Sequence, residues 1–417
     1  MPTRTLRFQG VSMGEDVLDH PCSKRRRYSL ACVLLCAIVT VVLPLAPTPL
    51  SGFVRPSRCP TSPYSAGSSG QGSACRMGSS AGVQHRSRVL ACAGKGGQLE
   101  RISPKLLTGK IRTAKTPREI IAIVELHAGD FNEIHTATCL YEIARKRGML
   151  RQAEAQVPIL HDLVDFADYQ TTQMVPYTLA NLAWSVAQLQ PLMGQHIMRL
   201  LPSIADQSMR TMRKFTPKDL SNLAWAFATV GDCNAPLLNK IADAFAHRIG
   251  ECNEQDLGNM AWSLATCEIT NLALMDAIAA RAVDIIGTFT PQGLSNVAWS
   301  YWRLGIRSHP LMRSVCAALQ KVTPRARVKK DLVFYWAIVM SAVVNVGASE
   351  EAPVVACAEA LLQPGHLRAA TDYSITALMR AAELGSWQPQ VPELCGALGQ
   401  EVQRRRIEQS ALDSDLI

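Results

Sequence analysis

Polar side chains recur at fixed distances from a series of tryptophans. Trp184 and Trp225 are 41 residues apart, and Trp262, Trp299 and Trp336 follow at intervals of 37 residues. If each tryptophan lies on a helix, the residues seven before, three before and four after it fall within about 40° of one another. The residues seven before and four after the first four tryptophans form a candidate stripe: Tyr177 and Gln188, Lys218 and Thr229, Gln255 and Thr266, Gln292 and Arg303.

The chemistry that this stripe could perform is recognition by hydrogen bonding. Lys, Gln, Thr and Arg side chains can donate to the edges of nucleobases, and a Tyr ring can stack on one. The side chains differ from copy to copy, so the stripe could distinguish successive positions of an extended partner.

Two further positions carry the same residue in each of the first four copies, an asparagine and the tryptophan itself. An asparagine lies three residues before each of the first four tryptophans, whereas Val333 takes this place before Trp336. Because the asparagine is the same in each copy, it cannot distinguish one copy from another, and we expect a ladder of amides that bonds neighbouring copies. We expect the tryptophans to pack against the next copy, and stacking on a base is the alternative. These structural anchors are Asn181, Trp184, Asn222, Trp225, Asn259, Trp262, Asn296, Trp299 and Trp336.

No motif in the sequence indicates catalysis. The sequence has neither of the glycine-rich phosphate-binding patterns and no paired histidines at metal-ligand spacing. We therefore predict a non-enzymatic protein without a catalytic residue, cofactor, metal site or small-molecule substrate.

The cysteines do not indicate a metal site or a disulfide framework. Thirteen are scattered without a C-x-x-C pair, and six of them precede residue 100. The remaining seven, an odd number, are expected to be buried as small apolar side chains. They are Cys139, Cys233, Cys252, Cys267, Cys316, Cys357 and Cys395.

The net charge of +9 belongs entirely to the first hundred residues. Residues 1–99 contain 12 Lys and Arg against 3 Asp and Glu, so the remaining 31 basic and 31 acidic residues cancel. The high isoelectric point is therefore no evidence for a nucleic-acid partner. One segment, 285–330, has no acid, and its basic residues could contact phosphates, although a solvated loop over 322–330 is the alternative. The candidate phosphate contacts are Arg307, Arg325, Arg327, Lys329 and Lys330.

The elements that position these residues are predicted to be helical hairpins. Around Trp225, Leu220, Leu223 and Phe227 share one face of a helix, as in a core stripe. A second apolar-periodic run follows each tryptophan segment, and Thr-Pro pairs at 216 and 290 mark helix starts. Because the period lies within the range of solenoids, we predict an all-α fold, an α-solenoid of stacked helical hairpins with a period of 37–41 residues.

The recurring core, Leu-x-Asn-Leu-Ala-Trp-x-x-Ala, resembles the octotricopeptide repeat family of organellar RNA-binding α-solenoids. The resemblance covers about residues 115–385, with divergent copies beginning near Phe131 and Tyr373. It implies binding of single-stranded RNA. Members of the family often end in a RAP domain, a nuclease-like module, but its pattern is absent from the tail over 389–417, so no nuclease role is expected.

The N-terminal hundred residues have the composition of targeting segments. Residues 24–27 are basic and precede a charge-free apolar run over 28–49, which is typical of a signal peptide; a membrane anchor over 28–49 is the alternative. Residues 53–99 are rich in Ser, Gly and Arg and have no acid, as in a transit peptide or a disordered linker. We predict four segments: 1–52 signal-peptide-like, 53–99 transit-peptide-like, 100–388 solenoid, and 389–417 C-terminal capping helix or tail.

Two functions from different classes follow. The first is binding of single-stranded RNA in a plastid, together with other RNA-processing proteins, in transcript stability, processing or translation. The second is a protein–protein interaction scaffold on the same solenoid. The resemblance and the basic segment favour RNA, whereas the neutral body favours the scaffold. Membrane contact is expected only through the N-terminal segment.

Overall fold

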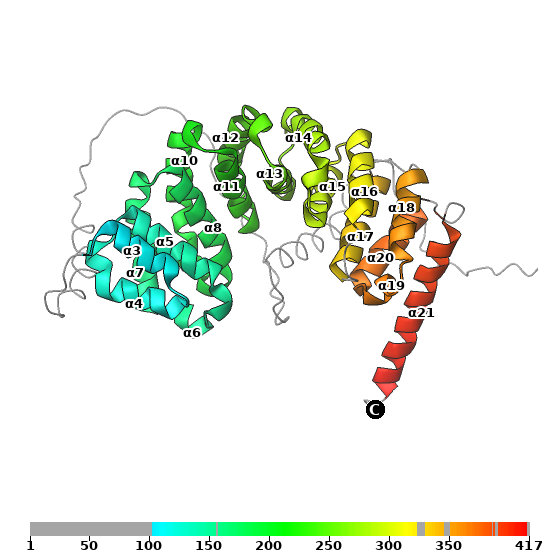
Figure 1. The fold of residues 1–417 in the computed structure, drawn as a ribbon, viewed down its shortest axis with the longest axis horizontal. Coiled ribbons are helices and arrows are strands. Elements are labelled where there is room, and N and C mark those ends of the chain that lie inside the picture. Colours follow the sequence, from blue (N-terminus) through cyan, green and yellow to red (C-terminus); the bar gives the residue numbers. More distant parts are fainter. Residues whose placement is uncertain are drawn as a thin grey trace, which may run out of the picture. The chain divides into compact units, whose positions relative to one another are not determined.

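The computed structural model describes residues 102–155, 157–322, 330–345, 351–385, 387 and 391–414. Every regular element in these ranges is a helix (Figure 1). The predicted signal-peptide-like and transit-peptide-like segments, and with them the possible anchor over 28–49, lie outside the described residues. Within the described part, no helix combines the length and the apolar character needed to cross a bilayer.

The long helices alternate between two rows. The first row consists of α3 (Pro104–Thr113), α5 (Glu133–Arg145), α8 (Pro176–Met193), α11 (Pro217–Thr229), α13 (Glu254–Thr266), α15 (Pro291–Leu304), α17 (Lys330–Asn345) and α20 (Asp372–Leu384). The second row consists of α4 (Pro117–His127), α7 (Pro158–Gln170), α10 (Leu200–Thr211), α12 (Ala235–Ala246), α14 (Leu272–Asp284), α16 (His309–Val322), α18 (Glu351–Leu361) and α21 (Pro392–Ser414).

Each helix packs on its predecessor and successor in the same row. The first-row helices contact one another in the order α3, α5, α8, α11, α13, α15, α17, α20, and the second-row helices do so from α4 to α21. The two helices of each hairpin also pack together, as α11 does with α12 and α13 with α14. This nearest-neighbour packing is that of an α-solenoid, so the predicted fold class is confirmed.

Short helices join the long ones. Among the described residues, the short α-helices are α6 (Gln152–Ala155), α9 (Gln195–Met198) and α19 (His366–Ala369). The 3-10 helices of the same described ranges are η1 (Ala128–Asp130), η2 (Arg147–Met149), η3 (Thr171–Gln173), η4 (Met212–Lys214), η5 (Ile249–Glu251) and η6 (Ile286–Thr288).

An insertion accounts for the longer interval between Trp184 and Trp225. The helix α8 has 18 residues, whereas α11 and α13 have 13 each. The additional helix α9 then precedes α10. The following repeats lack both features among the described residues, and their tryptophans are therefore closer in sequence.

Four first-row helices, α5, α11, α13 and α15, begin with the same local signal. A 3-10 turn leads to a buried apolar residue, such as Phe215 or Phe289, and then to a capping residue. Thr216, Asn253 and Thr290 each accept a hydrogen bond from the backbone N–H three residues later. Such caps satisfy N–H groups that the first helical turn leaves without a partner. The repeated signal fixes where each helix starts and therefore keeps equivalent residues in register.

The core lies between the two rows. Leu220, Leu223 and Phe227 are completely buried, as the helical periodicity predicts. Polar contacts also join neighbouring repeats: Ser221 Oγ donates to Asp256 Oδ1 at 3.2 Å, and Arg248 Nη1 donates to the Phe215 carbonyl at 2.7 Å. Hydrophobic burial and these cross-repeat bonds together hold each hairpin to the next.

The array extends beyond the copies that the sequence motif marks. The hairpin of α3 and α4 precedes the divergent copy near Phe131. At the other end, α21 packs against α18, α19 and α20.

Candidate nucleic-acid interface

The repeat tryptophans occupy one structural position. Trp184, Trp225, Trp262 and Trp299 are each the ninth residue of their helix, on α8, α11, α13 and α15. Because each of these four helices packs against the next, the residues seven and three before each tryptophan lie at matching places on adjacent helices. We call this set the polar row; it consists of Tyr177, Asn181, Lys218, Asn222, Gln255, Asn259, Gln292 and Asn296.

The second residue of each helix is the most accessible part of the polar row. Tyr177 is 55% exposed, Lys218 and Gln255 are also exposed, and Gln292 is half-buried. These positions carry a phenol, an ammonium and two amides, so they differ in chemistry from one repeat to the next. They are therefore suited to distinguish successive units of a ligand.

The four asparagines of the polar row are half-buried, and their side-chain amides form no hydrogen bond among the described residues. The backbone carbonyls of three of them accept side-chain hydrogen bonds: the hydroxyls of Ser185, Ser263 and Ser300 donate to the carbonyls of Asn181, Asn259 and Asn296 at 2.6–2.7 Å. The expected ladder of amides between repeats is therefore not present in this part of the chain.

The residues four after each tryptophan are much less accessible than the sequence suggested. Gln188 is 9% exposed. The hydroxyl oxygens of Thr229 and Thr266 are buried without a hydrogen-bond partner, and Arg303 forms an ion pair with Glu268. A helical wheel gives the direction of these side chains but not how closely the next helix packs on them. This half of the candidate stripe is therefore not an open surface.

The tryptophans become more buried along the chain. Trp184 and Trp225 are half-buried, whereas Trp262, Trp299 and Trp336 are 0–2% exposed. The Trp225 and Trp262 rings pack with their centroids 6.5 Å apart. Three residues before Trp336 the asparagine is replaced by Val333, and four residues after it stands Met340; both are fully buried. The series of asparagines thus ends before α17.

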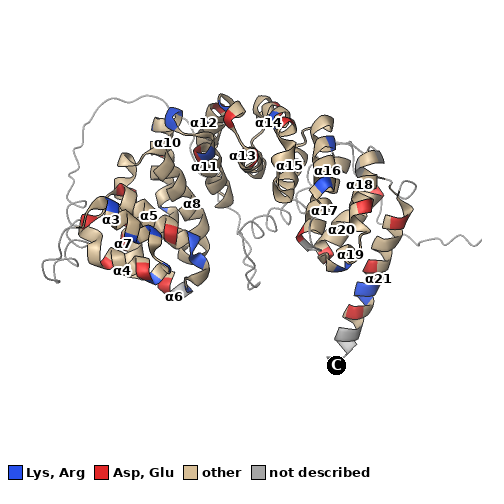
Figure 2. Cartoon of the chain, viewed as in Figure 1, with Lys and Arg blue, Asp and Glu red and all other residues tan. Residues whose placement is uncertain are grey.

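The predicted phosphate contacts are mostly outside the described residues. Arg307 is exposed in the connection between α15 and α16. Arg325, Arg327 and Lys329 fall within the undescribed segment 323–329, and the side chain of Lys330 is not described either. Elsewhere, Lys and Arg are interspersed with Asp and Glu (Figure 2). The basic cluster therefore remains a prediction.

Sequence reasoning missed two features of this surface. Tyr141 is the ninth residue of α5, so it takes the tryptophan position in the repeat that precedes α8, and its ring packs against Trp184. The sequence feature that could have identified this position is the capping residue Asn132. It precedes Tyr141 by the same number of residues as Thr216 precedes Trp225. Sequence reasoning also missed a disulfide, because Cys233 and Cys267 are bonded to each other rather than buried as free thiols.

The remaining described features do not suggest a reactive centre. Burial raises the pKa of the Cys252 and Cys316 thiols to about 12, so both are protonated near neutral pH. The described residues contain no group of three or more His, Cys, Asp or Glu that could hold a metal. A small pocket between α4 and α7 is lined mainly by apolar side chains, among them Val124, Phe131 and Phe166.

Comparisons with known proteins do not identify a family. No family model and no curated protein matches the chain. One similar solved structure is a circular tandem repeat protein with novel repeat topology and enhanced subunit contact surfaces. It is 10% identical, with a TM-score of 0.27, and the match covers 80% of this chain and 99% of that one.

Proposed function

We propose that the polar row binds single-stranded RNA. Stacked helical hairpins form a binding or scaffold fold, because each repeat adds a similar strip to one continuous surface. The observation that carries the proposal is the set of four asparagine amides, equivalent in position, half-exposed and free of hydrogen bonds to the rest of the described chain. Polar groups held in register without internal partners suit a ligand that repeats its own polar groups at regular intervals.

RNA has this repeating character. In helical-repeat proteins that bind RNA, two or three side chains of each repeat read one unpaired base. Adjacent helices pack about 8–10 Å apart, so successive repeats can face successive bases of an extended strand. The asparagine of each repeat would bond any base edge. The residue four before it varies, and where it is Lys218, Gln255 or Gln292 it would select among bases by hydrogen bonding.

The predicted phosphate contacts would add affinity without selectivity. Arg307 is exposed, and Arg325, Arg327, Lys329 and Lys330 follow it in the acid-free segment. Phosphate contacts position a strand, whereas base contacts specify it. Binding should therefore weaken as the salt concentration rises.

The site of action that we propose is a plastid, where the protein would act in transcript stability, processing or translation. This part rests on the composition of residues 1–99, which join a signal-peptide-like run to an acid-free Ser- and Arg-rich segment. A fusion of residues 1–99 to a fluorescent protein should accumulate in the plastid. Accumulation in the cytosol, or at a membrane with the segment uncleaved, would oppose this assignment.

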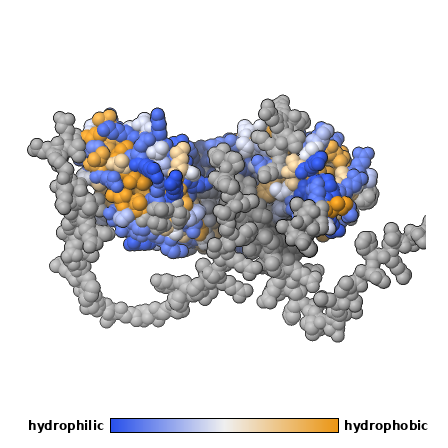
Figure 3. Space-filling view, turned by 90° about the horizontal axis from the view of Figure 1, so that it is seen from below, coloured by the Kyte–Doolittle hydropathy of each residue, from blue (hydrophilic) through white to orange (hydrophobic). Residues whose placement is uncertain are grey.

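One observation favours a protein scaffold as the second candidate. Large apolar side chains are exposed near the N-terminal end of the array, and an apolar area covers this part of the surface (Figure 3). They are Leu106, Leu126, Met149 and Tyr169, each 56–63% exposed. Exposed apolar patches commonly mark contacts with other proteins.

The first experiment is to measure binding of the full chain to a labelled pool of random single-stranded RNA by fluorescence anisotropy at low salt. Duplex RNA of the same length is the comparison. The proposal predicts saturable binding to the single strands, weaker binding to the duplex and loss of binding at high salt. A folded, monodisperse chain that binds neither RNA would instead support the scaffold.

A further inference from the structure

The aromatic surface at the start of the polar row involves α5, which lacks the repeat tryptophan. Ile134, Thr138 and Arg145 lie seven before, three before and four after Tyr141 on α5, so they match Tyr177, Asn181 and Gln188 on α8. The helices α5 and α8 pack directly against each other. The row of equivalent positions therefore continues one repeat towards the N-terminus.

Two aromatic rings pack together at this junction, and a third aromatic side chain lies on the same helix as one of them. The Tyr141 and Trp184 centroids are 5.2 Å apart with an interplanar angle of 50°, and both rings are half-buried. Tyr177, two turns before Trp184 on α8, is 55% exposed. Burial raises the pKa of the Tyr141 phenol; Arg145 opposes this increase and Tyr177 adds to it, so both side chains lie near Tyr141.

A cation lies beside these rings. The Arg145 guanidinium is 6.0 Å from the centroid of Tyr141, within the range of a cation–π contact, and its side chain is 56% exposed. Buried Glu142 pairs with both Arg145 and Lys146, and Arg147 follows directly. With three cations and one acid, residues 142–147 at the end of α5 and just after it have a net charge of +2.

The junction of α5 and α8 differs from the later repeats. Between α11 and α13, the partner of Trp225 is Trp262, which is 2% exposed. At the position of the exposed Tyr177, those two helices carry Lys218 and Gln255. Half-exposed rings, an exposed tyrosine and an exposed arginine occur together at the α5–α8 junction but not at these later ones.

We propose that Tyr141, Tyr177 and Trp184, together with Arg145, form a stacking site for one unpaired nucleobase and its phosphate at the N-terminal end of the polar row. Aromatic side chains stack bases of any identity, and a neighbouring arginine can neutralise the phosphate. The positive charge favours a nucleotide over an uncharged apolar side chain of a protein partner. This inference rests on the proposed binding of single-stranded RNA. At the N-terminal end of the array, the stacking site would bind a base of any identity.

The test replaces the exposed ring without disturbing the packed ones. In the full chain, Tyr177→Leu should weaken binding of a single-stranded RNA about tenfold, as expected for one lost base stack, whereas Tyr177→Phe should bind like the unmodified chain. Tyr169→Leu is the matched control, because Tyr169 is 57% exposed on α7 of the second row. Thermal unfolding of each variant should be unchanged, which separates binding from folding.

An RNA series with a single abasic nucleotide locates the contact. One abasic position should weaken binding to the unmodified chain and have no further effect on Tyr177→Leu, because the stack is then already absent. An RNA with 5-iodouridine at that position should crosslink on irradiation to Tyr141, Tyr177 or Trp184.

The outcomes distinguish the stacking site from the proposed function. If the unmodified chain and Tyr177→Leu bind single-stranded RNA equally, the stacking site is wrong while RNA binding stands. If every abasic position weakens both proteins alike, the site is again wrong. If the unmodified chain binds no RNA, the proposed function and this site both fail.

Discussion

Cys233 and Cys267 form a disulfide that joins the loop after α11 to the C-terminal end of α13, with their Cα atoms 5.3 Å apart. The bond links two adjacent repeats and spans 34 residues of sequence. It also lies next to Thr266 and Glu268, and Glu268 pairs with Arg303 of the following repeat. The expectation of free, buried cysteines was therefore wrong at these two positions.

The disulfide should stabilise the central repeats. A crosslink over a loop of this length typically contributes about 2–4 kcal/mol to the free energy of unfolding. Urea unfolding of the full chain should therefore shift to lower concentration when a dithiol reductant is added. The variant Cys233→Ser should unfold at the lower midpoint with or without reductant. An unmodified chain that is insensitive to reductant would contradict the bond.

Burial predicts how much each tryptophan contributes to stability. Trp299 is 1% exposed on α15, whereas Trp184 on α8 is half-buried. Trp299→Ala should lower the free energy of unfolding by about 3–5 kcal/mol, and Trp184→Ala by distinctly less. Chemical denaturation gives the two free energies of unfolding. In Trp299→Ala, hydrogen exchange should show that the loss of amide protection is concentrated in α13–α17, since each repeat depends on its neighbours. Equal losses would mean that the two sites are packed alike.

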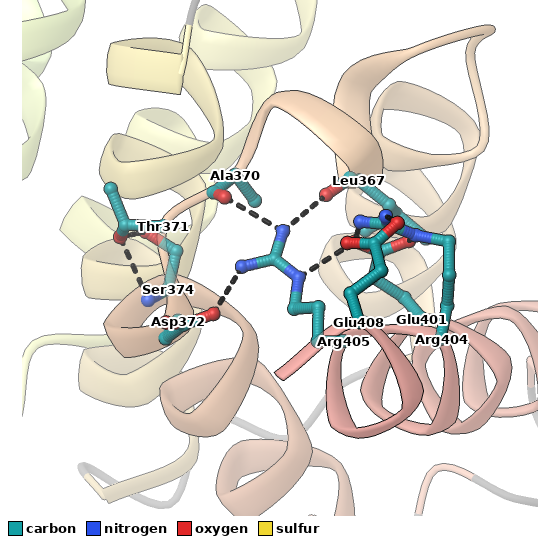
Figure 4. Close-up of polar contacts among 9 residues, drawn as sticks. All are labelled: Leu367, Ala370, Thr371, Asp372, Ser374, Glu401, Arg404, Arg405 and Glu408. Carbon is teal, nitrogen blue, oxygen red and sulfur yellow. Dashed lines mark hydrogen bonds and ion pairs between the residues drawn. The ribbon is translucent and has the colours of Figure 1, made fainter. Parts of the chain in front are cut away.

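The C-terminal helix should be anchored in a pH-dependent way. Arg405 donates to the carbonyls of Ala370 and Leu367 at 2.7 and 3.2 Å and pairs with Asp372, while Glu401 accepts from both Arg404 and Arg405 (Figure 4). The hydrogen bond from Arg404 lowers the pKa of the Glu401 carboxyl from 4.5 to about 2, although burial opposes this shift. The stabilisation by Glu401 is thus present above pH 4.5 and is lost as the pH falls towards 2.

At pH 7, Glu401→Gln should lower the free energy of unfolding by about 2 kcal/mol at most, since solvent partly screens the pair. At pH 3 the difference from the unmodified chain should be smaller. Glu383→Gln, exposed on α20, is the control and should have little effect at either pH. A Glu401→Gln effect of the same size at both pH values would show that the carboxylate charge is not involved.

Gln255 should influence which base is preferred. It is exposed at the second position of α13, where the side chain differs between repeats. Gln255→Ala should change the preference at one nucleotide of RNAs selected from a random pool, with only a few-fold loss of total affinity. Gln195→Ala on α9, also exposed, should leave the selected sequences unchanged. A uniform loss of affinity without a change of preference would indicate that Gln255 contacts the sugar-phosphate backbone of the RNA rather than a base.

The fold could be predicted from the sequence because its signals are local and repeated. The period of the tryptophans, the apolar spacing around Leu220 and Phe227 and the cap at Thr216 each act within one hairpin. Stacking then follows, since a single hairpin cannot bury its apolar face alone.

The candidate site could be predicted only in part. Helical periodicity gave the direction of Tyr177 and Lys218, which are exposed, but not that Gln188 is nearly buried and that the hydroxyl of Thr229 is buried. The difference arises from the distance between neighbouring helices, which no spacing within one helix encodes. For the same reason the pairs Tyr141–Trp184 and Cys233–Cys267 could not be predicted, because each joins different repeats.

The most direct test of RNA binding by the polar row removes two of its free amides. In the full chain, Asn222→Ala combined with Asn259→Ala should weaken binding of single-stranded RNA at least about tenfold, because each amide should contribute roughly 1 kcal/mol through its hydrogen bonds to a base. Asn239→Ala, an exposed asparagine on α12 of the second row, should bind like the unmodified chain. Fluorescence anisotropy at constant salt gives all three dissociation constants. A double variant that binds RNA as tightly as the unmodified chain would contradict the account.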